Sequence, residues 1–211
     1  MRYGKLLLLL LAVALASPAG VIFSENFEGA TPGYDSTIGV IPGTLFSLTA
    51  GSIDVNGTGY YASLCVIPPE SGNCIDTTGG SLPVRGTLQT TNQITFTTPG
   101  SYVLSFDLEG WYQPGITDAY ATVRVDLGSL IVDNEFTVYG ADNPYPVDNI
   151  PFTVTSPGTL AYLTFTDLSG DYSFAGGILD NVSISSTPEP GSVLLFGVGA
   201  LIVLARKRVR R

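Results

Sequence analysis

Two acidic residues, Asp107 and Glu109, have the spacing in this sequence that best suits acid–base chemistry. Residues two apart on a β-strand point to the same face, so an extended SFDLEG segment would present both carboxyl groups together. Such a pair can serve a glycoside hydrolase as general acid and as base or nucleophile. Trp111 and Tyr112 follow directly, and their rings are suited to stacking on a sugar. Two hypotheses start here: a weak glycan hydrolase that uses the carboxyl pair, and a sugar-binding surface built on the two aromatic residues.

The composition argues against most catalytic chemistry. The sequence has no histidine, which removes the commonest general base, histidine zinc sites and Ser-His or Cys-His nucleophiles. All 18 acidic residues but only two basic ones, Arg85 and Arg124, lie in segment 21–190, whose formal charge is 2 − 18 = −16. That charge repels nucleic acid and suits calcium, a sugar-rich milieu or solubility alone. We therefore predict a protein that is not an enzyme and has no nucleic-acid partner.

Cys65 and Cys74 are the two cysteines of the chain. They enclose a short loop that is rich in proline and glycine, and there is no C-x-x-C motif to indicate metal or redox chemistry. In an exported protein this spacing predicts one local disulfide. The alternative is a pair of free thiols.

Residues 1–19 have the three parts of a secretory signal peptide. Arg2 and Lys5 provide the charged start, and an uninterrupted apolar run follows. Small residues then allow cleavage after Ala19, which we prefer, or after Ala16. An uncleaved anchor is the alternative, although the apolar run is short for a membrane span.

The last 25 residues, 187–211, contain three features in a fixed order. Pro188, Glu189 and Pro190 come first, and the two prolines favour an extended backbone. Residues 191–205 are uncharged and apolar, which predicts a single transmembrane helix near the lower length limit. Residues 206–211 are basic and, under the positive-inside rule, stay in the cytoplasm. The domain before the tail would then lie outside the inner membrane.

This tail closely resembles the PEP-CTERM sorting signal of Gram-negative bacteria, with Pro188, Glu189 and Pro190 as the sorting motif. The resemblance implies recognition by exosortase, a membrane-embedded processing enzyme, and delivery to the cell surface or the extracellular matrix. It also implies a setting of exopolysaccharide and biofilm. The alternative is a plain single-span anchor with a proline-rich stem.

The remaining segment, 20–186, predicts an all-β domain. It shows no long helical period, and short runs of β-branched and aromatic residues alternate with turn sequences. We expect around nine strands, including 60–66, 102–108, 120–127, 160–168 and 178–185. So many strands in one domain favour a two-sheet β-sandwich.

The two ends of this domain, VIFSENFEG and GGILDNVSIS, resemble those of jelly-roll carbohydrate-binding and galactose-binding-like modules. The resemblance implies a jelly-roll-like β-sandwich whose first and last strands lie together. It also implies a structural calcium held by Glu25, Glu28 and Asp180, since carboxylate oxygens are what Ca²⁺ requires. The alternative is that these residues are surface charge at a solvated strand edge.

Taken together, the sequence predicts an exported surface or matrix protein that is non-enzymatic and binds extracellular polysaccharide. A purely structural matrix or adhesion protein without a defined ligand is the first alternative. A glycan hydrolase using Asp107 and Glu109 is the second.

Overall fold

The structure is a computed structural model that describes residues 20–35, 38–61, 65, 72–79, 85–110, 120–130, 133–139, 145–169 and 176–187. The predicted signal peptide, Trp111, Tyr112 and the tail from Pro188 onward lie outside these ranges. Within the described ranges, helical structure is limited to the 3-10 turn η2 (Gly128–Leu130). No helix in the described part has the length and hydropathy of a membrane span.

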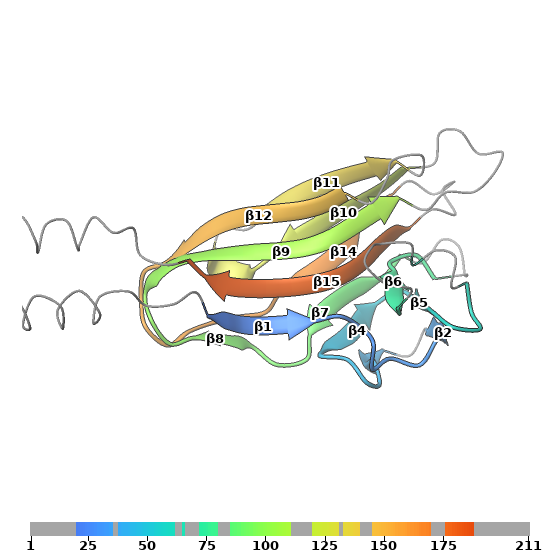
Figure 1. Ribbon diagram of the computed structural model, residues 1–211, viewed down its shortest axis with the longest axis horizontal. Coiled ribbons are helices and arrows are strands. Elements are labelled where there is room, and N and C mark those ends of the chain that lie inside the picture. Colours follow the sequence, from blue (N-terminus) through green and yellow to red (C-terminus); the bar gives the residue numbers. More distant parts are fainter. Residues whose placement is uncertain are drawn as a thin grey trace, which may run out of the picture.

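The described residues form two large antiparallel sheets and a small third one (Figure 1). The seven-stranded sheet has the order β12-β9-β15-β6-β5-β2, with β1 beside β15. Its strands are β1 (Val21–Glu25), β2 (Gly33–Asp35), β5 (Ile53–Asn56), β6 (Cys74–Asp76), β9 (Gly100–Gly110), β12 (Tyr145–Val154) and β15 (Gly177–Ser186).

The six-stranded sheet has the order β11-β10-β14-β7-β4-β3. Its strands are β3 (Gly39–Val40), β4 (Phe46–Ala50), β7 (Thr87–Thr90), β10 (Tyr120–Asp126), β11 (Asp133–Tyr139) and β14 (Thr164–Asp167), and β8 (Ile94–Phe96) pairs with β13 (Thr159–Ala161) in the two-stranded sheet. The chain passes repeatedly between the two large sheets, as in a Greek-key sandwich. The predicted all-β sandwich is therefore confirmed.

The core lies between the two large sheets because their strands alternate apolar and polar residues. In β9, Tyr102, Leu104, Phe106 and Leu108 are buried, whereas the residues between them are half-buried on the outer face. Phe106 meets Phe165 of the opposite sheet with ring centroids 5.2 Å apart. Contacts of this kind close the sandwich, and the odd-numbered residues of β9, from 103 to 109, lie on its outer face.

The last strand changes its alternation at a β-bulge. Leu179 faces the core, but after the bulge it is Val182 and Ile184 that do so, because the register with β9 shifts between Asp180 and Ser183. Asn181 takes the extra position with φ 49°, a left-handed conformation that asparagine tolerates better than most residues. The bulge leaves Asp180 and Asn181 next to each other at the outer face.

The first and last strands lie together, as the resemblance to jelly-roll modules implies. β1 pairs with β15 from Val21 opposite Ser185 to Glu25 opposite Val182. The main chains of Gly20 and Ser186 also bond to each other, with the Ser186 N–H donating to the Gly20 carbonyl at 2.9 Å. The start of β1 and the end of β15 are therefore side by side at one end of the sandwich (Figure 1).

Some strand predictions are wrong. The run 160–168 is not one strand: β13 and β14 belong to different sheets, with Tyr162 and Leu163 between them. In the run 60–66, Tyr60 and Tyr61 form only isolated bridges with Gly57, and Cys65 lies in no strand. The described residues form fifteen strands rather than about nine, because strands of two to four residues such as β2, β3, β5 and β6 are too short to show a clear period.

Candidate functional site

Carboxylic acids gather on the outer face of the seven-stranded sheet. In one row across the strands, Glu109 of β9 stands opposite Ile178 of β15, Ile178 opposite Asp76 of β6, and Asp76 opposite Asp54 of β5. In the next row, Asp107 of β9 stands opposite Asp180 of β15. A core residue directly precedes each acid along its strand, so all five acids point away from the core.

The first half of this face comprises Asp107, Glu109, Asp180 and Asn181, and is called the β9–β15 patch. The Nδ2 group of Asn181 donates to Oδ2 of Asp107 at 2.8 Å, and the Asn181 N–H donates to Oδ1 of Asp180 at 2.7 Å. Asp107 and Glu109 are half-buried and Asn181 is exposed, so a ligand in solution has access to the patch. The two acids of the sequence-based pair do share one face of β9, as their spacing predicts.

Burial changes the protonation of this patch. It raises the pKa of Glu109 to about 7. Burial also raises the pKa of Asp180 to about 7; the bond from Asn181 opposes this rise, while the charges of Asp107, Glu28 and Glu25 add to it. Near neutral pH a fraction of these carboxyl groups is therefore protonated, and a protonated carboxyl both donates and accepts hydrogen bonds.

The predicted calcium ligands Glu25, Glu28 and Asp180 are near enough to interact electrostatically, but two of them already have structural roles. The buried Glu25 accepts the Phe27 N–H at 2.7 Å with Oε1 and the Leu45 N–H at 2.6 Å with Oε2. It thereby holds the turn after β1 against the segment before β4. No group of three Asp, Glu, Cys or His residues in the described ranges is arranged to hold a metal ion. Calcium at these residues stays a prediction.

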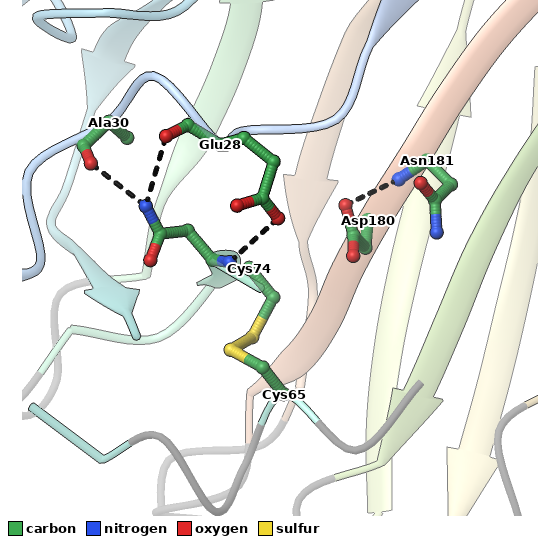
Figure 2. Close-up of a disulfide and its surroundings, with 7 residues drawn as sticks. Glu28, Ala30, Cys65, Cys74, Asp180 and Asn181 are labelled. Carbon is green, nitrogen blue, oxygen red and sulfur yellow. Dashed lines mark hydrogen bonds between the residues drawn. A yellow bond between two sulfur atoms is a disulfide. The ribbon is translucent and has the colours of Figure 1, made fainter. Parts of the chain in front are cut away.

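Glu28 connects the β1 turn to the start of β6. Its Oε1 accepts the Asn73 N–H at 3.0 Å, and the Asn73 side chain donates to the Ala30 carbonyl at 2.9 Å. Figure 2 shows the Glu28 carboxylate, which accepts the Asn73 N–H, on the side of the β1 turn that faces Asp180 of β15. A cation shared by Glu28 and Asp180 would have to fit beside the Asn73 bond.

The predicted disulfide between Cys65 and Cys74 is confirmed, with Cα atoms 5.6 Å apart (Figure 2). Cys74 belongs to β6 and is fully buried, and the disulfide packs against Ile178 of β15 in a small apolar cluster of its own. This cluster lies on the outer face of the sheet, between its two acidic halves.

The second half of the face, called the β5–β6 patch, comprises Asp54, Asn56 and Asp76. Asp54 and Asp76 stand directly opposite each other and are only 7% and 5% exposed. Burial raises the pKa of Asp76 well above its usual range, against the Thr78 N–H bond and with help from the charges of Asp54 and Asp167. Asn56 is fully buried, and neither its Nδ2 nor its Oδ1 has a hydrogen-bond partner among the described residues.

The β5–β6 patch was not predicted from the sequence. Its segments read I-D-V-N and C-I-D, which alternate apolar and polar residues over only three or four positions. Alternation that short is common in loops, and both faces of β5 are buried, so composition did not mark it either. The two glycines around S-I-D-V-N, Gly51 and Gly57, were the available signal for a short strand.

Asp167 is another buried acid, and several hydrogen-bond donors surround its carboxylate. Asp167 at the end of β14 accepts the Thr77 hydroxyl at 3.0 Å and also bonds to Thr78 and Ser169. Its Oδ1 lies 3.6 Å from Nη1 of Arg85. Several donors and one cation therefore surround the buried Asp167 carboxylate, as the burial of a polar group requires.

Comparison with known proteins gives one sequence match and several structural ones. Residues 186–211 match the PEP-CTERM protein-sorting motif. No curated protein matches the chain. Solved structures with some likeness include a CBM35 from Paenibacillus barcinonensis, with 13% identity, a TM-score of 0.40, and coverage of 68% of this chain and 94% of that one.

Two further structures cover more of the chain. The N-terminal cellulose-binding domain of Cellulomonas fimi β-1,4-glucanase C has 14% identity, a TM-score of 0.39, and coverage of 81% of this chain and 99% of that one. The K3 cleaved adhesin domain of Lys-gingipain from Porphyromonas gingivalis has 15% identity, a TM-score of 0.40, and coverage of 81% and 100%. Such low identities carry neither a ligand nor an activity across to this chain.

The sorting motif is the feature that the sequence and the comparisons share. The Pro188-Glu189-Pro190 triplet, the apolar stretch and the basic end all fall inside the matched range. The chain therefore carries a PEP-CTERM protein-sorting motif at residues 186–211, which indicates export and sorting.

Proposed function

We propose that this chain is a non-enzymatic surface or matrix protein that exosortase processes at the inner membrane, and that its sandwich binds extracellular polysaccharide. The PEP-CTERM motif supports the delivery route. The signal-peptide pattern of residues 1–19 and the basic residues 206–211 support a topology with the sandwich outside. In this topology the acidic face of the seven-stranded sheet meets the extracellular matrix.

The β9–β15 patch is the observation that carries the binding proposal. Sugar hydroxyls donate and accept hydrogen bonds, and they are recognised by side chains that do the same. The patch offers the carboxyl groups of Asp107 and Glu109 and the exposed amide of Asn181 on one accessible face. Trp111 and Tyr112 directly follow β9 in the sequence and are the proposed stacking platform.

Charge narrows the class of polysaccharide. Segment 21–190 carries a formal charge of −16, and one of its two arginines, Arg85, already pairs with Asp167. A polymer of uronic acids or sulfated sugars would meet like charge over the whole domain. The proposed ligand is therefore a neutral or amine-bearing exopolysaccharide.

Retention of the full chain on an array of bacterial and plant polysaccharides tests this proposal. Trp111→Ala and Asn181→Gly should each weaken retention, because one removes a platform and the other removes an amide while keeping the backbone conformation. Thr166→Ala, on the half-buried outer position of β14 in the other sheet, is the matched control and should bind like wild type. Wild-type protein that binds no polysaccharide would refute the proposal in favour of a purely structural matrix protein.

Processing is tested separately. Replacement of Pro188, Glu189 and Pro190 by alanine should leave unprocessed protein in the inner membrane, whatever the sandwich binds. Immunoblots of the membrane and extracellular fractions measure the processing. Processing that is unchanged in this variant would reject the role of the motif in this chain.

Hydrolysis of a glycan is the second candidate, and the raised pKa of Glu109 is the observation in its favour. A carboxyl group with a pKa of about 7 can act as a general acid near neutral pH. Asp107 lies two residues away on the same face of β9, so its carboxyl group is the candidate partner of Glu109. Release of reducing ends by wild type and its loss in Glu109→Gln would establish this reaction, and no release from any polysaccharide would exclude it.

Structural calcium at Glu25, Glu28 and Asp180 is proposed from the resemblance to jelly-roll modules. Bound Ca²⁺ would offset the mutual repulsion of these carboxylates and hold the first and last strands together. The melting temperature should then rise with Ca²⁺, and Asp180→Ala should remove the part of the rise that this site contributes. A melt that is insensitive to EDTA would reject the site.

A further inference from the structure

The β5–β6 patch places two carboxylates against each other in a buried position. Asp54 and Asp76 face each other across neighbouring strands on one side of the sheet, and the electrostatic interaction between them is repulsive. Like charges directly opposite on a sheet destabilise it, and burial strengthens the repulsion. Arg85, the nearby cation, lies against Asp167.

Asn56 provides an independent observation at the same place. It lies two residues after Asp54 on β5, so its side chain shares the outer face with Asp54. Its register partner is Cys74, two residues before Asp76 on β6. The amide is 0% exposed and lacks a partner for both Oδ1 and Nδ2. A buried amide without hydrogen bonds is costly, which indicates that a bound group accompanies it in the native protein.

We propose that the β5–β6 patch binds a hard divalent cation such as Ca²⁺ through the carboxylates of Asp54 and Asp76 and the Oδ1 of Asn56. Calcium takes six to eight oxygen ligands and combines carboxylates, side-chain amides and water in one shell. A water bound to the ion would accept the Nδ2–H of Asn56, so one hydrated ion gives both Asn56 atoms a partner and offsets the repulsion between the two carboxylates. A sugar ring is too large for residues that are 7%, 5% and 0% exposed.

This cation site is separate from the β9–β15 patch and from the calcium proposed at Glu28 and Asp180. The disulfide and Ile178 occupy the face between the two groups of acids. Tyr60 lies at the edge of the β5–β6 patch, with its hydroxyl donating weakly to Oδ1 of Asp54 at 3.4 Å. An ion here would link β5 and β6, two short strands that share only three register pairs.

Terbium binding tests the site, because Tb³⁺ takes calcium sites and emits when a nearby tyrosine is excited. The full chain is stripped with EDTA, dialysed, titrated with Tb³⁺ and then challenged with Ca²⁺, and the Ca²⁺-induced rise in melting temperature is measured in parallel. Wild type should show tyrosine-sensitised emission that Ca²⁺ displaces. Tyr60→Phe should lose most of the emission yet keep the Ca²⁺-induced rise, since it removes the sensitiser and leaves the three ligands.

Asp76→Asn is the decisive variant. Asparagine keeps an oxygen to accept the Thr78 N–H, which Asp76 accepts at 2.9 Å, but it removes a charged ligand. Emission and the Ca²⁺ response at this site should be lost. Asp180→Asn, the same change on the other side of the disulfide, is the matched control and should keep the tyrosine-sensitised emission. Emission that persists in Asp76→Asn, or is absent from wild type, would overturn the proposal.

Asn56→Asp guards against a variant that fails only because it misfolds. A third carboxylate should bind the cation more tightly, because affinity rises with ligand charge. The metal-free variant should melt at a lower temperature than metal-free wild type and gain more from Ca²⁺. Unchanged or weaker Ca²⁺ binding in Asn56→Asp would also overturn the proposal, and circular dichroism verifies the fold of each variant.

Discussion

The two acidic halves of the outer face have the same chemistry but different surroundings. The β9–β15 patch holds Asp107 and Glu109 half-buried and Asp180 buried, and Asn181 bonds to both Asp107 and Asp180. The β5–β6 patch buries Asp54 and Asp76 almost completely and leaves the Asn56 amide without a partner. Accessible groups that already make some hydrogen bonds, as in the β9–β15 patch, suit a ligand that binds reversibly. The buried Asn56 amide, which makes none with the described residues, suits a permanently bound small ion.

The disulfide between the two patches should have the largest effect on stability. Replacing Cys65 and Cys74 by serine removes a cross-link with a sequence separation of nine residues. The expected loss is about 2–4 kcal/mol in the free energy of unfolding, because the unfolded chain regains the entropy of the closed loop. Urea unfolding of the double variant measures it. The Ca²⁺ response of the β5–β6 patch should weaken in parallel, whereas an unchanged response would mean that the disulfide does not support that patch.

The bulge at Asn181 comes next and concerns the β9–β15 patch alone. Asn181→Val should cost about 1–2 kcal/mol or more, since a β-branched residue resists the left-handed backbone at φ 49°. Asn181→Gly keeps the backbone conformation and loses only the bond to Asp107. Thermal unfolding should therefore rank the stability as wild type, glycine variant, valine variant. Equal melting of the glycine and valine variants would contradict this account of the bulge.

Removing one of two opposed charges should change the free energy of unfolding by different amounts in the two patches. In EDTA at pH 8, Asp76→Asn should stabilise the fold by up to about 1 kcal/mol, because it relieves the repulsion with Asp54. Asp107→Asn relieves a similar pairing with Asp180 in a half-buried setting, so its gain should be smaller. Chemical denaturation of both variants without metal provides the comparison. A larger gain from Asp107→Asn would reverse our ranking of the two environments.

The pH dependence of Glu109 should be the smallest effect, since this group is half-buried. Burial raises its pKa from an ordinary 4.5 to about 7, so between these values the folded protein holds a proton that the unfolded chain has released. Its contribution to stability is therefore fully present below pH 4.5 and is lost as the pH rises to about 7. The difference in melting temperature between pH 5 and pH 8 should be smaller in Glu109→Gln than in wild type. A difference of the same size in both proteins would contradict this account of Glu109.

The sequence by itself determined the features that depend on local chemistry. The sorting motif is a contiguous run of residues, and the disulfide joins cysteines only nine positions apart. The shared face of Asp107 and Glu109 follows from the two-residue period of any strand. The long strand β9 was readable because it alternates over ten residues, which short strands cannot do.

The tertiary structure alone decided which residues meet across strands. Asp54 and Asp76 are 22 positions apart and become neighbours only through the register of β5 with β6. The apposition of Asp107 and Asp180 depends in the same way on a strand pairing that joins residues 73 positions apart. Register is set by the packing of whole core faces, and a shift by one residue would turn every side chain of a strand to the opposite face. For this reason the acidic face could not be predicted from the sequence, although the sequence contains each of its acidic residues.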